Sequence, residues 1–241
     1  MNKTVLIKLS GESLAGINED KRGLDDNYVE EICTRIKKMH DLGVRIGIVC
    51  GGGNFMRGGR TSKVIEKEVA DYIGMLGTIM NGLALYDAFK RIGCPSHVQS
   101  GLSVAMPYTS NLNAMEALSL LDEGKIVIFG GGTGHPGCST DTASADRAID
   151  IKADMIIKLT NVDGVYDKDP HKYNDAVKYD EVTFDEVLEK KLEVMDLEAM
   201  EKCRNNNIEI IVADISQEDV LLDIINNKKV GTKVLKRVNK I

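Results

Sequence analysis

Short apolar runs alternate with amphipathic stretches along the whole chain. The runs rich in Val, Ile and Leu have the length of buried strands and cover residues 4–9, 44–49, 125–129, 155–159 and 208–212. Apolar residues recur at helical spacing over residues 26–40, 66–91, 113–121, 140–151, 185–191, 197–205 and 217–226. Strands that alternate with helices predict an α/β fold with a largely parallel central sheet.

Residues that typically begin or end a helix stand at the ends of the predicted elements. Asp25 or Asp26 is placed to cap the first helix, and Gly43 stands just beyond its end. Residues 98–107 are less regular, residues 161–170 form a polar, turn-rich loop, and the chain ends in a short tail rich in valine. Because no linker or repeat divides the chain, we expect a single domain over residues 1–241.

Composition narrows the class of protein. The content of 43% hydrophobic and 28% charged residues is that of an ordinary soluble globular protein. The net charge of -6 argues against a nucleic-acid-binding surface, and the chain lacks the run of about 18 apolar residues that a membrane helix needs. The 5 cysteines are scattered without a C-x-x-C pair, which argues against disulfides or zinc and for the reducing cytoplasm.

Glycine-rich loops follow three of the predicted strands, at residues 10–12, 50–54 and 130–137. In open parallel sheets, ligands bind beyond the carboxyl ends of the strands. Glycines let consecutive backbone N–H groups approach an anion, so three such loops at one sheet edge suit a chain of phosphates. The alternative is that these glycines only form turns.

Two familiar phosphate motifs were compared with these loops. No G-x-x-x-x-G-K-[ST] sequence is present, which excludes a P-loop kinase. Gly132, Gly134 and Gly137 do form a G-x-G-x-x-G, but Pro136 lies inside the turn and the first strand–helix unit lacks this fingerprint. A dinucleotide-dependent dehydrogenase is therefore the weaker alternative.

Four charged residues are candidates for phosphate chemistry. Lys8 and Lys158 lie inside apolar strands, where a lysine is costly unless it is paired. Lys8 directly precedes a glycine loop and suits a phosphate, although an edge-strand lysine would point to solvent. Arg57 follows the second glycine loop and is either a phosphate ligand or a solvated loop residue. Asp141 opens a helix, as a cap or as an organiser of lysines or Mg²⁺.

Glycines also recur inside the long helix predicted over residues 66–91. Gly74, Gly77 and Gly82 each destabilise a helix by about 0.5–1 kcal/mol relative to alanine. Their presence indicates that something passes close to this helix, and tight packing of a second helix is an equally good explanation.

Several motifs, in this order along the chain, resemble the amino acid kinase superfamily. They are KLSGE at 8–12, GGGN at 51–54, DYIGMLGTIMNGL at 71–83, GTGHP at 132–136, STD at 139–141, TNVDGVY at 160–166 and VMD at 194–196. The stretches at 71–83, 132–141 and 194–196 are most similar to the bacterial uridylate (UMP) kinases within that superfamily. The chain departs at Gly137-Cys138, where many members carry two aromatic residues beside the uracil site.

The resemblance implies a three-layer αβα sandwich that assembles as a homohexamer. It implies transfer of the γ-phosphoryl group of MgATP to UMP, giving UDP and ADP, in pyrimidine nucleotide biosynthesis. ATP and Mg²⁺ are the implied cofactors, with no protein residue assigned as a metal ligand. GTP activation and UTP inhibition are also implied, and residues 15–24 resemble the region tied to GTP.

Site residues follow from the resemblance, position by position. It implies catalytic roles for Lys8, Arg57 and Asp141. Positions matching ATP contacts are Lys8, Leu9, Ser10, Gly11, Gly53, Arg57, Thr160, Asn161, Tyr166 and Asp169. Positions matching UMP contacts are Gly52, Asp71, Thr133, Gly134, His135, Pro136, Gly137, Cys138, Ser139 and Thr140. The attacking phosphate oxygen is already anionic at neutral pH, so no general base is required.

Two alternatives stay open at this point. Related kinases of the superfamily phosphorylate a carboxylate or carbamate, as acetylglutamate, glutamate, aspartate and carbamate kinases do. Molybdenum storage proteins resemble UMP kinases and bind nucleotide without this activity, although here Lys8, Arg57, Asp71 and Asp141 are all present.

Overall fold

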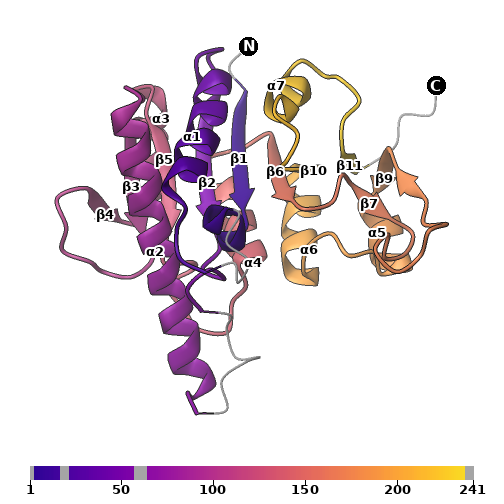
Figure 1. The fold of residues 1–241 in the computed structure, drawn as a ribbon, viewed down its shortest axis with the longest axis horizontal. Helices are drawn as coiled ribbons and strands as arrows, with labels where there is room; N and C mark the ends of the chain where they lie inside the picture. The colour runs from indigo at the N-terminus through magenta and orange to yellow at the C-terminus, as the bar shows by residue number, and fades with distance from the viewer. Residues whose placement is uncertain (1–2, 17–21, 57–63, 237–241) are drawn as a thin grey trace.

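A nine-stranded sheet runs through the described part of the chain, which comprises residues 3–16, 22–56 and 64–236 of a computed structural model (Figure 1). Its strands, in spatial order, are β4 (Thr109–Asn111), β3 (Ser96–Ser100), β5 (Ile126–Gly130), β2 (Arg45–Cys50), β1 (Thr4–Leu9), β6 (Met155–Thr160), β10 (Glu209–Asp214), β11 (Thr232–Leu235) and β9 (Glu181–Thr183). Neighbours from β4 to β10 are parallel, β11 runs antiparallel to β10, and β9 follows β11. A small hairpin, β7 (Val165–Tyr166) and β8 (Lys178–Tyr179), lies beside this sheet.

Helices cover both faces of the sheet. One hydrophobic core joins the sheet to α1 (Asp26–His40), α2 (Lys67–Arg91) and α7 (Val220–Ile225), with the 3₁₀ turn η1 (Gly11–Ala15) nearby. The other core joins it to α3 (Ala114–Asp122), α4 (Thr140–Asp150), α5 (Phe184–Lys190) and α6 (Leu197–Asn206). The predicted three-layer αβα architecture is therefore confirmed. The first turns of α2 project beyond the sheet in Figure 1.

The helix ends predicted from capping residues and from Gly43 are confirmed. Asp25, rather than Asp26, caps α1 by accepting a hydrogen bond from the Tyr28 N–H at 3.1 Å. Gly43 has φ = +83°, a backbone conformation that favours glycine, and it ends the connection from α1 to β2. Ser139 caps α4 by accepting from the Thr142 N–H, which leaves Asp141 in the first turn free for other partners.

Some predicted boundaries were wrong. The irregular stretch at 98–107 begins inside β3, whose sequence Ser-His-Val-Gln-Ser carries one β-branched residue and hides its strand character. The valine-rich tail contains β11, which runs antiparallel to its neighbour β10. The last helix was predicted over residues 217–226, but α7 spans only Val220–Ile225.

Candidate active site

A cleft of about 340 Å³ opens beyond the carboxyl ends of β1, β2 and β5. One wall is the face of α2 that carries Asp71, Gly74 and Thr78. The structure brings these predicted site residues together along the cleft: Lys8, Ser10, Gly11, Gly52, Gly53, Asp71, Thr133, His135, Cys138, Ser139 and Thr140. Gly134, Pro136 and Gly137 belong to the same loop between β5 and α4, and Leu9 is fully buried in the core. Arg57 lies outside the described residues.

Two lysines flank one carboxylate at the base of this site. Lys8 and Lys158 lie directly opposite each other on the parallel strands β1 and β6. Lys8 Nζ is 3.1 Å from Asp141 Oδ1, and Lys158 Nζ is 3.5 Å from Asp141 Oδ2. Since β1 is an interior strand, the edge-strand interpretation of Lys8 is wrong, and Asp141 organises lysines rather than capping α4.

Burial and a neighbouring positive charge both disfavour the charged form of Lys158. Burial is the largest cause that lowers the pKa of Lys158, the neighbouring Lys8 charge lowers it further, and Asp141 opposes both. The Lys158 ammonium also donates a hydrogen bond to the Val194 carbonyl oxygen. An ammonium pair in a partly dry cleft is suited to a multiply charged anion, because interactions between charges strengthen as water is excluded.

Asp71 joins the opposite wall to the glycine-rich loop between β5 and α4. Its Oδ2 accepts a hydrogen bond from the Gly137 N–H at 2.9 Å. The carboxylate thus orders the loop in which the acceptor-site residues Thr133 to Thr140 were predicted. It also faces the cleft with acceptor atoms only, which suits a ligand that offers hydroxyl or N–H donors.

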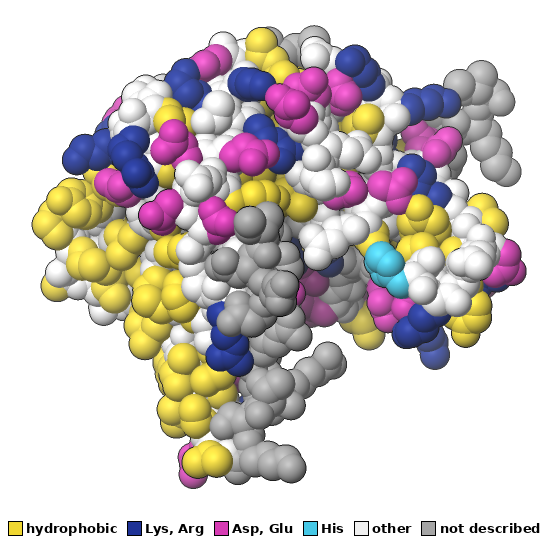
Figure 2. All heavy atoms as spheres, viewed as in Figure 1, with side chains coloured by type: hydrophobic (Ala, Val, Ile, Leu, Met, Phe, Trp, Pro, Cys, Tyr) yellow, Lys and Arg dark blue, Asp and Glu magenta, His cyan; other side chains and the backbone are white. Residues whose placement is uncertain are grey.

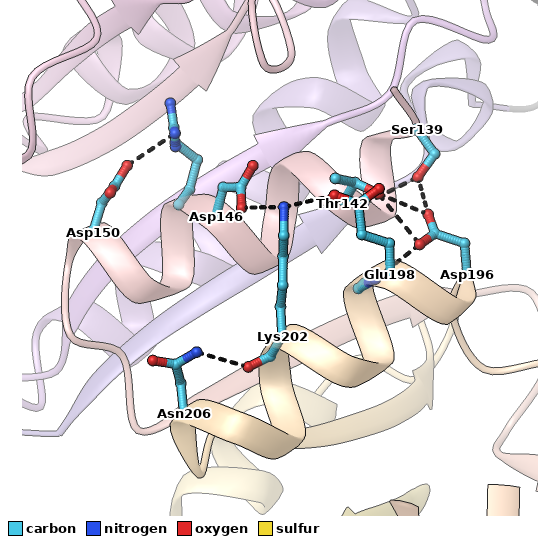
Figure 3. Close-up of polar contacts among 10 residues, drawn as sticks. Ser139, Thr142, Asp146, Asp150, Asp196, Glu198, Lys202 and Asn206 are labelled. Atoms are coloured by element: carbon cyan, nitrogen blue, oxygen red, sulfur yellow. Dashed lines mark hydrogen bonds and ion pairs between the residues drawn. The ribbon is translucent and has the colours of Figure 1, made fainter. Parts of the chain in front are cut away.

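Polar side chains join α4 to α6 (Figure 3), and one of them, Ser139, also lines the cleft. Asp196 accepts hydrogen bonds from the hydroxyls of Ser139 and Thr142, and it also caps α6 through the Ala199 N–H. Burial alone would raise the pKa of Asp196, but these hydrogen bonds outweigh burial and hold it below the usual value. Asp196 belongs to the motif at 194–196, which by itself did not predict this role, although an Asp directly before a helical stretch is a capping signal.

Of the three glycines of α2, Gly77 has the tightest surroundings, whereas a Cβ on Gly74 would meet no atom within 4 Å. A Cβ on Gly52 would clash with the carbonyl oxygen of Gly74, and a Cβ on Gly77 would lie 3.2 Å from Cβ of Phe55. The element that passes close to this helix is therefore the glycine loop after β2. Gly82 instead faces side chains of β5 and β3, so packing of a second helix is not the explanation at these positions.

A second cleft, of about 490 Å³, lies beside the β7–β8 hairpin and the end of α5. Tyr166 and Asp169, predicted from the resemblance to contact ATP, line this cleft. Thr160 ends β6, and Asn161 follows it at the approach to the hairpin. Of the residues predicted to contact nucleotides, most line or adjoin the first cleft, whereas Tyr166 and Asp169 line the second.

Features of membrane helices and of clustered metal ligands are not found in the described part of the chain. Among the described residues, no helix combines the length and apolar character needed to cross a membrane. Residues 3–16, 22–56 and 64–236 also contain no group of three or more His, Cys, Asp or Glu side chains that would hold a metal ion.

Comparison with known proteins identifies the family. The model of the amino acid kinase family matches residues 3–214, which run from the start of β1 to the end of β10. The chain belongs to the amino acid kinase family. This membership favours a phosphotransferase site at the glycine loops over the dinucleotide-binding alternative.

Relatives within the family share nearly the full length. A uridylate kinase from Acinetobacter baylyi is 44% identical over 237 residues, which is 96% of each chain. One from Psychrobacter cryohalolentis is 43% identical over 232 residues, 95% of each chain. The crystal structure of a UMP kinase from Bacillus anthracis superposes with a TM-score of 0.93 at 33% identity, covering 98% of this chain and 97% of that one.

Proposed function

We propose that this amino acid kinase transfers the γ-phosphoryl group of ATP to UMP, giving UDP and ADP in pyrimidine nucleotide biosynthesis. The observation that carries the proposal is that Lys8, which pairs with Asp141, and three glycine-rich loops line one cleft together with Asp71. Full-length similarity to proteins named uridylate kinase supports UMP as the acceptor.

Catalysis in this proposal is positioning and charge stabilisation. The phosphoryl group passes between two anionic oxygens, so the site must hold both phosphates in line and offset their charge. Lys8 neutralises the β- and γ-phosphates, while Ser10, Gly11 and Gly53 direct polar groups along the phosphate chain. Asp141 keeps the ammonium groups of Lys8 and Lys158 in place. Arg57, outside the described residues, would hold phosphate oxygens at the donor–acceptor junction.

The two substrates occupy different parts of the site. The acceptor UMP lies against Gly52, Asp71 and the loop from Thr133 to Thr140. The adenosine of ATP lies toward Thr160, Asn161, Tyr166 and Asp169, beside the hairpin cleft, and Leu9 contributes its backbone at the end of β1. Mg²⁺ enters with ATP as MgATP, because this ion keeps most of its waters and suits phosphate oxygens better than a protein cage.

We propose that the chain forms one domain that self-associates, as a homohexamer. Val69, Tyr72, Leu76 and Met80 are exposed by 38–48% and are spaced three or four residues apart on α2. Figure 2 shows hydrophobic side chains gathered over the projecting part of this helix. A stripe of this kind on one helix face supports contact with a second copy.

The proposal also covers the regulators of the enzyme and its cellular compartment. GTP as activator and UTP as inhibitor follow from membership of the uridylate kinase group, with residues 15–24 as the GTP-linked region. Of these, residues 17–21 lie outside the described part. The scattered cysteines and the absence of any metal or disulfide motif in the sequence support a cytoplasmic protein.

An assay of ADP release from ATP tests the function directly. UMP, CMP, dUMP and acetylglutamate serve as acceptors, with and without GTP. We expect a clear preference for UMP. A preference for acetylglutamate would identify a carboxylate kinase instead, and nucleotide binding without ADP formation would identify a storage or binding protein.

A further inference from the structure

Two buried polar side chains of α2 lie one helical turn apart and face the cleft loops. Thr78 is 6% exposed and Asn81 is fully buried. Residues three apart on a helix share a face, so both side chains point toward the same region. Neither residue was assigned a role from the sequence, and the proposed transfer of phosphate uses neither directly.

Asn81 holds the glycine loop that follows β2. Its amide donates to the Gly51 carbonyl oxygen at 2.7 Å and exchanges two hydrogen bonds of 2.9 Å with the amide of Asn54. Asn54 is also buried and donates to the Gly23 carbonyl oxygen at 2.8 Å. The loop 51–54 is thus bound at both ends of its glycine run to one side chain of α2.

Thr78 holds the glycine loop that follows β5. Its hydroxyl accepts a hydrogen bond from the Gly131 N–H at 2.7 Å and donates to the Met75 carbonyl oxygen at 2.7 Å. Gly131 has φ = +72°, so the chain reverses there and enters the predicted acceptor loop. The hydroxyl of Thr78 therefore fixes the first residue of that turn.

The physical requirement is the same for both loops. Backbone N–H groups stabilise a transferring phosphate only if they point at it before the reaction, because any reorganisation adds to the barrier. The glycines of such a loop have no side chains that could hold that direction. Buried hydrogen bonds from a rigid helix supply it, and a buried polar partner left unpaired is strongly unfavourable.

We propose that Thr78 and Asn81 are positioning residues for the two substrates of the proposed reaction. Asn81 sets the loop 51–54, which borders both the donor and the acceptor. Thr78 sets the loop from Gly131, which serves the acceptor alone. The inference rests on the proposed function for the identity of donor and acceptor.

The test uses near-isosteric substitutions in the full chain, with KM for ATP, KM for UMP and kcat measured separately. Thr78→Val removes only the hydroxyl, and we expect the KM for UMP to rise about fivefold to tenfold with little change in the KM for ATP. Thr78→Ser retains the hydroxyl, so its KM for UMP should stay close to the wild-type value. Asn81→Leu removes the amide, and we expect both KM values to rise and kcat to fall at least about tenfold.

Gln99→Leu is the matched control. Gln99 is another fully buried amide, bonded to the Asn113 carbonyl oxygen and to Glu116, and it does not line the cleft. A role of Thr78 and Asn81 in stability alone would reduce the active fraction and leave both KM values unchanged, as we expect for Gln99→Leu. That result would overturn the inference, as would equal changes of both KM values in Thr78→Val.

The outcomes separate this inference from the proposed function. If the wild-type chain transfers phosphate to another acceptor, the proposed function is wrong, and the KM of Thr78→Val for that acceptor then decides the inference. Calorimetric titration with UMP and with a non-hydrolysable ATP analogue measures the effect of each variant on the two affinities separately, without turnover. If Asn81→Leu does not fold, the Thr78→Val and Thr78→Ser pair decides the inference alone.

Discussion

The two clefts of this molecule differ in how far their polar contacts are buried. In the cleft beside α2, the loops are tied by side chains that are themselves buried, such as Asn81 and Thr78. Beside the β7–β8 hairpin, one buried hydroxyl, that of Thr232, accepts from the Val165 N–H at 2.8 Å and donates to the Tyr179 carbonyl oxygen, but charged side chains pair at the surface. Lys178 Nζ is 3.0 Å from Asp163 Oδ2, with the two side chains 33% and 39% exposed.

The difference follows from what each cleft has to do. Buried hydrogen bonds in a low dielectric have one good geometry, so they keep a loop in one place. Exposed ion pairs are screened by water and stabilise little, so a segment held by them adjusts easily. Under the proposed function, in-line transfer needs the first kind of support at the phosphates, whereas binding of the base and ribose of ATP would tolerate the second.

Lys8→Ala tests the rigid cleft most severely. The ammonium of Lys8 matters most while the γ-phosphoryl group moves, so kcat should fall by about 100-fold or more and the KM for UMP should change far less. Steady-state kinetics with varied UMP at saturating ATP measures both. A kcat close to the wild-type value would contradict the role, and Lys38→Ala, at an exposed position of α1, is the control expected to leave kcat unchanged.

Asp196→Ala tests the polar contacts that join α4 to α6. It removes the cap of α6 and the acceptor for the hydroxyls of Ser139 and Thr142, and we expect a loss of about 1–2 kcal/mol in unfolding free energy at pH 7. Denaturant titration of both proteins measures it.

The same pair of proteins should show a defined pH dependence. Because the folded pKa of Asp196 lies below its usual value of 3.8, its contribution is complete above that value and is lost as the pH falls through the folded pKa. The gap in stability between Asp196→Ala and wild type should therefore narrow in acid. A gap that is constant from pH 7 to pH 2 would show that the charge of Asp196 contributes nothing.

Asp71→Asn should have a smaller and more selective effect. Asparagine keeps an oxygen for the Gly137 N–H but loses the negative charge that strengthens hydrogen bonds from the hydroxyl and N–H groups of UMP. We expect the KM for UMP to rise about tenfold with kcat within about threefold of wild type. An unchanged KM for UMP would make Asp71 purely structural.

Asp163→Asn, at the hairpin, should have the smallest effect. The Lys178 pair is about one-third exposed, so screening limits its contribution to less than about 1 kcal/mol. The hydrogen bond from the Tyr166 hydroxyl to Asp163 raises the pKa of Tyr166, so this pKa should fall toward its usual value of 10.0 in the variant. Ultraviolet titration measures it. A loss of activity comparable to that of Lys8→Ala would end the contrast between the two clefts.

The periodic elements and the glycine loops were predictable because their signals are local. The strand at 4–9 and the helix capped at Asp25 could be predicted from residues within each segment alone. β3 was not predictable, since Ser96 to Ser100 become a strand only through pairing with β5 and β4. The reversal of β11 likewise depends on its partner β10, which no local signal specifies.

By itself, the sequence determined the α/β alternation, the glycine loops and the presence of charged residues at the ends of buried strands. Only the tertiary structure decided that Lys8 and Lys158 share Asp141, that Asn81 binds the loop after β2, and that Asp196 joins α4 to α6. Periodicity reports which face of an element is buried, because burial acts on each residue separately. A hydrogen bond or ion pair between distant segments depends on two positions at once, and only the packed sheet and helices bring them together.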